Sequence, residues 1–368
     1  MHQLDRAKHS LEFKTPCGAF IPNPSETTSM KKHLLICISF AHVTLGTALG
    51  QAHAYLWDPT IGIRDLGTVG ADSQAYAVND SGTVVGWYVP TDGRIYFHGF
   101  IWTEATGMVD IGVPGGGDSD TAEVFCFAIN NAGNVVGRAR QVDGRQVAFF
   151  WSPTDGFTTL WHHSTNSDNG NSAYAINDLD QVTGNLNVNK HGLIYHAFLW
   201  SPGMGNPRDL GVVDGAQYSL GNGINNQGKI VGGSYVIGEA WEPMSWTKQS
   251  GMNLIGMIPG TVYAQALAIN DAGQVVGIDQ TGTSDLSFYT APGMGLKSLK
   301  GLGGITTYAS AINQNGVIAG SAEDTTNTRH AVRWLTPTSA PEVFSPEAAN
   351  ALGINNLGQI VGQAYFPQ

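Results

Sequence analysis

Acidic and histidine side chains gather in the irregular links between recurring segments, and their chemistry would suit a ligand. Carboxylates are the ligands that calcium prefers, and imidazole suits zinc. The sequence therefore offers a candidate ligand site that could hold calcium or a transition metal, although we expect no cofactor. The alternative is that these groups are solvated loop side chains. The residues are Asp118, Asp120, His162, His163, Asp168 and Asp214.

Aromatic residues in the same links are a second candidate binding feature, because rings can stack on the faces of sugars. The alternative is that they pack between neighbouring repeats. Three of them, Trp87, Trp161 and Tyr218, join the candidate ligand-binding set. The others are Tyr88, Tyr96, Trp241 and Tyr263.

Catalytic motifs do not occur in this sequence. It contains no G-x-S-x-G, H-E-x-x-H, G-x-G-x-x-G, P-loop or C-x-x-C pattern. We therefore predict no catalytic residue and do not expect an enzyme. Paired acids for glycoside hydrolysis are recognised by their separation in space, which a sequence does not give.

The candidate residues lie between copies of one short motif, seen in "AVNDSGTVVG", "AINNAGNVVG" and "AINDAGQVVG". Seven copies follow one another at intervals of 42 to 51 residues. A repeat length in the forties is typical of β-propeller blades or of a solenoid. The motif asparagines are Asn79, Asn130, Asn177, Asn225, Asn270, Asn313 and Asn355.

Two further elements recur between these copies, one resembling "HAFLW" and one resembling "RDLG". Each repeat thus holds four short strand candidates, which is the content of a propeller blade. In N-D-x-G the asparagine caps a turn and the glycine takes a positive φ, as in a hairpin with a G1 bulge. Tryptophans end six of the second elements and are expected to anchor the core: Trp57, Trp102, Trp151, Trp200, Trp246 and Trp334.

The order of the elements predicts how the ends meet. The repeats start with "HAYLW" and finish with "GQIVGQAYF", so each end holds half a blade. Pairing the halves would close the ring and leave no open sheet edge there. We therefore expect an all-β fold, a seven-bladed β-propeller with four short strands per blade, closed by a composite blade from both termini.

His53, His98, His196 and His330 occupy the same place in four repeats. A catalytic residue is needed once, so a residue that recurs with the repeat is expected to be structural. We expect the same of the motif asparagines, as turn formers, and of the tryptophans.

The combined pattern resembles the HAF-repeat family of probable extracellular proteins, named for a tripeptide seen here at His196-Ala197-Phe198. The resemblance covers residues 51–368 almost completely. It implies secretion and a repeat structure. It implies no activity and supplies no catalytic residues.

The N-terminal region predicts export. Lys31 and Lys32 precede a mostly apolar run from Leu34 to Leu49, followed by small residues, which is typical of a signal peptide. We assign residues 30–50 to a signal peptide and 51–368 to a single propeller domain of seven repeats, and we expect residues 1–29 to be a mis-called extension or disordered. Secretion to the periplasm or beyond the cell is expected, with no membrane span after cleavage.

The net charge of residues 51–368 indicates which classes of partner the protein can bind. Residues 1–50 hold five of the 18 Lys and Arg and three of the 29 Asp and Glu, which leaves 13 basic and 26 acidic residues. Such a surface repels nucleic acid. Only Cys126 follows the signal peptide, so no internal disulfide is expected and this thiol is expected to be an inert buried group.

Links that vary from repeat to repeat would lie together on one face of such a disc, and variable loops on a rigid scaffold are where binding sites usually occur. We therefore expect a monomeric, non-enzymatic binding scaffold that holds a protein or glycan partner on the irregular-loop face. The alternatives are a polysaccharide-acting hydrolase or lyase, with acids such as Asp118 and Asp120, and a structural or adhesive surface module.

Overall fold

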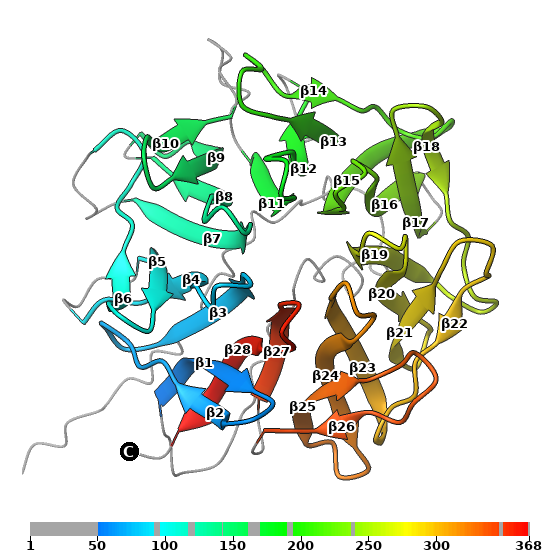
Figure 1. Cartoon of the computed structure of the whole chain (residues 1–368). Helices are drawn as coiled ribbons and strands as arrows, with labels where there is room; N and C mark the ends of the chain where they lie inside the picture. The colour runs from blue at the N-terminus through cyan, green and yellow to red at the C-terminus, as the bar shows by residue number, and fades with distance from the viewer. Residues whose placement is uncertain are drawn as a thin grey trace, which may run out of the picture. The chain divides into compact units, whose positions relative to one another are not determined.

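The computed structural model describes residues 51–91, 96–116, 122–141, 143–160, 170–189, 194–236, 240–345 and 349–366. They belong to one compact unit, and every regular element among them is a β-strand. No helix that could cross a membrane is found in these residues. Four-stranded antiparallel meanders stand around a central axis, which is the arrangement of a β-propeller (Figure 1).

The first half of the chain forms three sheets of four strands. One contains β3 (Ser73–Val78), β4 (Val84–Tyr88), β5 (His98–Thr103) and β6 (Gly107–Asp110). The next contains β7 (Glu123–Ile129), β8 (Val135–Arg140), β9 (Gln146–Ser152) and β10 (Gly156–Thr159). The third contains β11 (Ser172–Ile176), β12 (Val182–Asn187), β13 (Tyr195–Trp200) and β14 (Arg208–Asp209).

A fourth sheet contains β15 (Ala216–Ile224), β16 (Ile230–Val236), β17 (Trp241–Thr247) and β18 (Gly251–Leu254). An eight-stranded sheet follows, made of two meanders joined by a parallel pairing of Asp285 with Thr306. Its first meander is β19 (Tyr263–Ile269), β20 (Val275–Gln280), β21 (Asp285–Thr290) and β22 (Lys297–Ser298). Its second is β23 (Gly303–Ile312), β24 (Ile318–Asp324), β25 (Arg329–Trp334) and β26 (Glu342–Val343).

The last sheet joins the two ends of the described chain. It has the order β2-β1-β28-β27, and β1 pairs with β28 along its length, from Gln51 opposite Phe366 to Trp57 opposite Ile360. The blue and red strands therefore lie side by side in Figure 1. Segments about 300 residues apart in sequence thus share one sheet, as the order of the repeats predicts. Its strands are β1 (Gln51–Asp58), β2 (Gly62–Asp65), β27 (Ala349–Ile354) and β28 (Ile360–Phe366).

A β-bulge in the innermost strand explains the glycine that ends each x-V-V-G segment. In β3 the register shifts between Ala75 and Ala77. A Cβ on Gly86 would come within 1.9 Å of the Gln74 carbonyl oxygen and 2.8 Å of the Phe100 ring. Only glycine leaves room for both the bulged backbone and the phenylalanine of the H-A-F element. The same register shift and close approach recur in the other innermost strands.

Apolar side chains from adjacent sheets interdigitate to form the core. Trp334 is fully buried, and its indole N–H donates to the Lys300 carbonyl oxygen at 2.8 Å. Cys126 is also fully buried, and burial, with a smaller contribution from Asp110, raises the pKa of its thiol. The thiolate is therefore suppressed at neutral pH.

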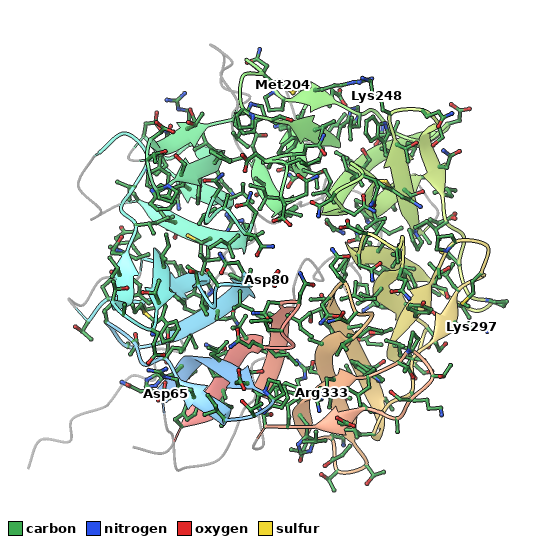
Figure 2. The ribbon with its side chains drawn as sticks, viewed as in Figure 1. Asp65, Asp80, Met204, Lys248, Lys297 and Arg333 are labelled. Carbon is green, nitrogen blue, oxygen red and sulfur yellow. The ribbon has the colours of Figure 1, made fainter. Side chains whose placement is uncertain are left out.

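The H-A-F histidine and the D-L-G aspartate form cross-strand pairs on the outer strands. His98 Nδ1 lies 2.7 Å from an Asp110 carboxylate oxygen, and His196 Nδ1 lies 2.9 Å from Asp209. His53 pairs with Asp65 in the same way, at 2.9 Å. Figure 2 shows Asp65 at the outer side of its sheet and Asp80 near the axis. In the fourth case the partner differs, since His330 Nε2 contacts Asp324 at 3.0 Å.

Replacing Trp334 by Ala should destabilise the domain by about 3–5 kcal/mol, because removal of a fully buried large aromatic leaves a cavity. The matched control is Val343→Ala at the exposed outer edge, where a change within about 0.5 kcal/mol is expected. Urea unfolding of both variants measures the difference. Equal losses would contradict the assignment of Trp334 to the core.

Stability should fall in acid through the pair that Asp110 forms with His98. Burial raises the pKa of Asp110, but hydrogen bonds from His98, Tyr88 and the Gly112 N–H outweigh it, and the net shift is downward. A carboxyl group with a lowered pKa in the folded state adds stability above its unfolded pKa of about 4, and this is lost as pH falls through the folded value.

Asp110→Asn should therefore lower the urea midpoint at pH 7, and the gap to the parent protein should shrink below about pH 4. Asp214→Asn, at an exposed position, serves as the control. A gap that stays constant from pH 7 to pH 3 would show that the Asp110 charge adds nothing.

Candidate functional site

The repeat asparagines converge on the axis, where each holds its own turn. Asn79 Oδ1 accepts from the backbone N–H of Ser81 at 3.2 Å and of Thr83 at 3.0 Å. Gly82 follows with a φ of 78°, and Asp180 takes the equivalent left-handed position in the third turn with a φ of 57°. These side chains are buried, as turn-forming groups with satisfied hydrogen bonds should be.

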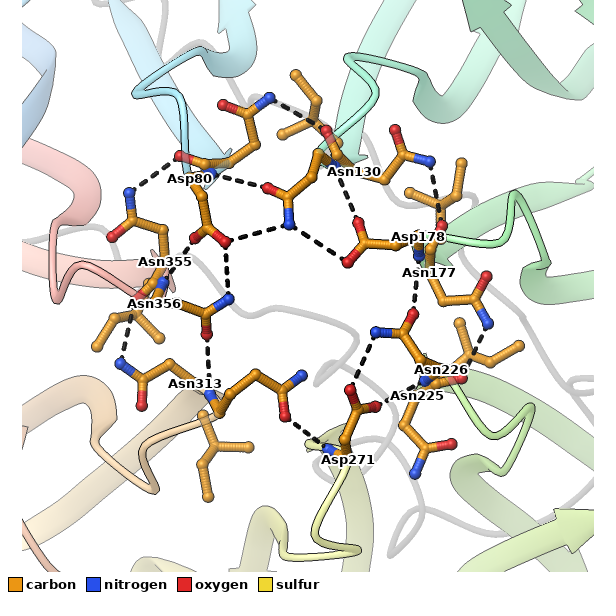
Figure 3. A pocket seen from close by; sticks show the side chains of 18 of the residues that line it. Asp80, Asn130, Asn177, Asp178, Asn225, Asn226, Asp271, Asn313, Asn355 and Asn356 are labelled. Atoms are coloured by element: carbon orange, nitrogen blue, oxygen red, sulfur yellow. Dashed lines mark hydrogen bonds between the residues drawn. The ribbon is translucent and has the colours of Figure 1, made fainter.

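The same asparagines also link neighbouring turns into an inner circle of hydrogen bonds. Asn79 Nδ2 donates to the Asn130 carbonyl oxygen at 3.1 Å, and Asn130 donates to Asn177 in the same way. The pattern continues through Asn225, Asn270, Asn313 and Asn355, and Asn355 donates to the Asn79 carbonyl oxygen at 2.9 Å. The inner circle therefore closes on itself across the two ends of the chain, through the bond from Asn355 back to the first turn that is drawn in Figure 3.

A second circle is formed by the residue that follows each asparagine. Its backbone N–H donates to the side-chain oxygen of the corresponding residue in the next turn, at 2.8–3.0 Å. Both circles run in the same direction. We call these residues the mouth residues: Asp80, Asn131, Asp178, Asn226, Asp271, Gln314 and Asn356.

Together the two circles line a hollow of about 190 Å³ on the axis. The isoleucine or valine that precedes each asparagine, such as Val78 and Ile129, also borders the hollow, but nearly all of the accessible lining is polar. The rim is polar and carries three carboxylates, from Asp80, Asp178 and Asp271. No lysine or arginine in the described residues forms an ion pair with any of the three. We call this hollow the axial pocket.

Side-chain amide groups position all three carboxylates. Asn131 Nδ2 donates to Asp80 Oδ2 at 3.1 Å and to Asp178 Oδ2 at 3.3 Å, so one amide bridges both (Figure 3). Asp80 also accepts from the N–H and the Nδ2 of Asn356, each at 2.8 Å. Asp271 accepts from Asn226 only, at 2.8 and 3.0 Å.

Most of the candidate residues from the loops fall outside the described part of the chain. These are Asp118, Asp120, Trp161, His162, His163 and Asp168. Asp214 is exposed in the link that precedes β15. No group of three or more His, Cys, Asp or Glu side chains in the described residues is placed to hold a metal ion.

The two described aromatic candidates do not meet at one site. Trp87 is buried between sheets, where its indole N–H donates to Gln74 Oε1 at 3.1 Å and its ring meets Phe97 edge-on. Tyr218 packs on Tyr235, and burial, with a smaller contribution from that neighbour, raises its pKa. Trp87 thus follows the alternative interpretation, as a packing residue.

The mouth residues were missed because sequence reasoning stopped at the turn-forming asparagine beside them. A usable signal was present in the alternation of Asp with Asn or Gln at the next position. Adjacent donors and acceptors of this kind indicate side chains that bond to each other, which requires the turns to meet at one place.

Comparisons with known proteins give a likeness of fold. No protein-family model and no curated protein matches the chain. Among solved structures, a puromycin hydrolase S511A mutant has a TM-score of 0.55 at 9% identity, over 82% of this chain and 53% of its own. A protein assigned as TolB from Agrobacterium tumefaciens has a TM-score of 0.50 at 9% identity, over 87% of this chain and 100% of its own. The present chain therefore spans about half of the puromycin hydrolase.

These likenesses establish the all-β propeller fold, and at such low identity they establish nothing finer. They also correct our main functional expectation. The absence of catalytic motifs led us to expect a non-enzymatic scaffold, but a solved structure that shares this propeller fold belongs to a hydrolase. The expectation of a non-enzymatic binding scaffold is therefore wrong as an inference from this fold.

Converting Asn270 to Asp tests the inner circle. Its Nδ2 donates to the Asn313 carbonyl oxygen at 3.0 Å and to Gln274 Oε1 at 2.6 Å, so a carboxylate would face two acceptors. We expect a loss of about 2–4 kcal/mol, because a buried charge would lie against unpaired oxygens. Gln227→Glu, an amide-to-acid change at the exposed tip of the preceding turn, should be nearly neutral. Thermal unfolding that shows equal effects would rule out the inner circle as a stabilising element.

Proposed function

We propose that the protein is a hydrolase that cleaves glycosidic bonds in a polysaccharide, with the axial pocket as its reaction site. The observation that carries the proposal is the pair of carboxylates, Asp80 and Asp178, that share one amide. A hydrolytic role is consistent with the fold, because puromycin hydrolase has a propeller of similar shape.

The spacing of the pair supports this chemistry. Asn131 Nδ2 lies 3.1 Å from Asp80 Oδ2 and 3.3 Å from Asp178 Oδ2. The two Oδ2 atoms are therefore at most about 6.4 Å apart. Carboxyl groups about 5–5.5 Å apart are typical of retaining glycoside hydrolases, and about 6.5–9.5 Å of inverting ones. The pair therefore favours a retaining reaction, in which one carboxylate attacks the sugar and the other transfers the proton.

The roles follow from how each group is held. Asp80 accepts three hydrogen bonds and is fixed in orientation, which suits the nucleophile. Asp178 is exposed and, among the described residues, accepts only from Asn131, which suits the group that exchanges protons with the leaving oxygen and then with water.

The remaining rim suits a ligand with many hydroxyl groups. Asparagine and glutamine side chains both donate and accept hydrogen bonds, as sugar hydroxyls do. Gln314 is exposed at the rim, and its Nε2 donates to no other group in the described residues, so it is available to a sugar.

We further propose seven blades, by counting the eight-stranded sheet as two. Its halves are complete four-stranded meanders that share a single parallel pairing. Export through the N-terminal signal and membership of the HAF-repeat family, as the repeat indicates, complete the proposal.

The experiment is release of reducing ends from a panel of neutral and acidic polysaccharides by the purified protein. On a glycan that is cleaved, Asp80→Asn and Asp178→Asn should each lower kcat/KM by about 100-fold or more, with an unchanged melting temperature. The matched control is Asp271→Asn, which lies in the same circle and accepts the same pair of bonds from its neighbour but shares no amide with a second carboxylate. Absence of turnover on every glycan, or equal effects of all three variants, would refute the proposal.

A further inference from the structure

A buried arginine lies between two sheets, near the end of β8 that is opposite the mouth residue Asn131. Arg138 is in β8, where it pairs with Phe125 on one side and Ala148 on the other, and only 5% of its surface is exposed. It lies toward the end of the strand that leads into the irregular links. A guanidinium is charged at every physiological pH, so its burial requires compensation.

That compensation is incomplete within the described chain. The Gln146 side-chain oxygen, in the amide orientation that satisfies both partners, accepts from Arg138 Nε and Nη1 at 2.9 Å each. The rings of Phe125 and Phe127 lie 4.8 and 5.9 Å from the guanidinium carbon. No carboxylate of the described residues pairs with Arg138, so its guanidinium has no counter-charge among them.

Asn171, which directly precedes β11, carries a second buried donor. Asn171 is 1% exposed, its Oδ1 accepts from the Asn187 N–H at 2.8 Å, and its Nδ2 is enclosed without an acceptor. Because Oδ1 is fixed by that bond, the direction of Nδ2 is fixed too. Leaving such a donor unpaired is unfavourable.

Strand alternation places the two donors opposite each other. β8 packs against β11, and Val136 and Ala173 meet in one apolar cluster between these sheets. Arg138 follows Val136 by two residues, and Asn171 precedes Ala173 by two, so each lies on the same face as its neighbour. β8 runs toward the irregular links and β11 runs away from them, so both donors lie on the same side of the cluster.

We propose that Arg138 and Asn171 form a binding site for a small oxyanion, a group with two or more oxygens such as a carboxylate, phosphate or sulfate. The guanidinium fork matches two such oxygens, and the amide N–H adds a third, directed contact. Asn185 Oδ1, an acceptor that would repel an oxyanion, also lacks a partner, but it lies on the other face of its strand. Leu186 points into the apolar cluster, so the neighbouring Asn185 points away from it. The site goes beyond the proposed hydrolase activity and lies apart from the axial pocket.

The test is a thermal melt of the purified protein in sodium acetate, phosphate or sulfate, with sodium chloride at the same ionic strength as reference. A saturable rise of about 2–5 °C is expected with at least one oxyanion. Acetate alone would identify a carboxylate site, and phosphate or sulfate a tetrahedral one. The rise should vanish in Arg138→Met and persist in Arg140→Met, an exposed arginine on the same face of the same strand.

Asn171→Asp keeps the proposal testable if Arg138→Met does not fold. It places a carboxylate where the amide N–H lies, so the chain supplies its own partner to Arg138. This variant should melt higher than the parent in chloride and lose the response to oxyanions. No response in the parent, a response that Arg138→Met retains, or an Asn171→Asp variant that still responds would each overturn the proposal.

Discussion

The seven asparagine turns that meet on the axis are the constraint on which the rest of the structure depends. Each buried amide satisfies its own turn through Oδ1 and the next turn through Nδ2. A sheet of four strands exposes edges and has little core of its own. The inner circle fixes how neighbouring sheets approach each other, and the apolar clusters between them follow from that approach.

Closure of the ring makes the two ends of the described chain interdependent. β1 and β28 share a sheet, and Gln359 donates to Asp58 across it at 3.0 Å. The bonds of Asp58 to Thr60 and to this glutamine lower its pKa to about 2, so the carboxylate remains charged throughout the neutral range. Asn355, in the last turn, donates to the Asn79 carbonyl oxygen in the first turn, so every turn in the inner circle is bonded to a neighbour on each side.

The sequence was sufficient for the strands, the turns and the composite sheet because these depend on local chemistry that recurs. Gly82 needs a positive φ, and Gly86 needs to lack a side chain because the bulged strand lies so close. Glycine therefore occupies the Gly86 position in every repeat and the Gly82 position in all but the third, which has Asp180. The pairing of His98 with Asp110 was not predicted, since it joins two elements that sequence reasoning treated separately.

The candidate site could not be predicted in the same way. Asp80, Asn131 and Asp178 are distant in sequence and meet only because the turns converge, so their shared hydrogen bonds exist only in three dimensions. Arg138 looked like an ordinary charged residue near the end of a strand, and only its burial and its partners show that it lacks a counter-charge.

Amide hydrogen exchange at the mouth residues tests the central claim most directly. In an isolated turn the N–H groups of Asp80, Asn131 and Asp178 would exchange freely, because turn residues of this kind are open to water. In the closed circle each donates to the next turn, so slow exchange is predicted together at all of the turns, to a similar degree. Rapid exchange at these positions, while the strands remain protected, would contradict the closed circle and with it the fixed geometry of the axial pocket.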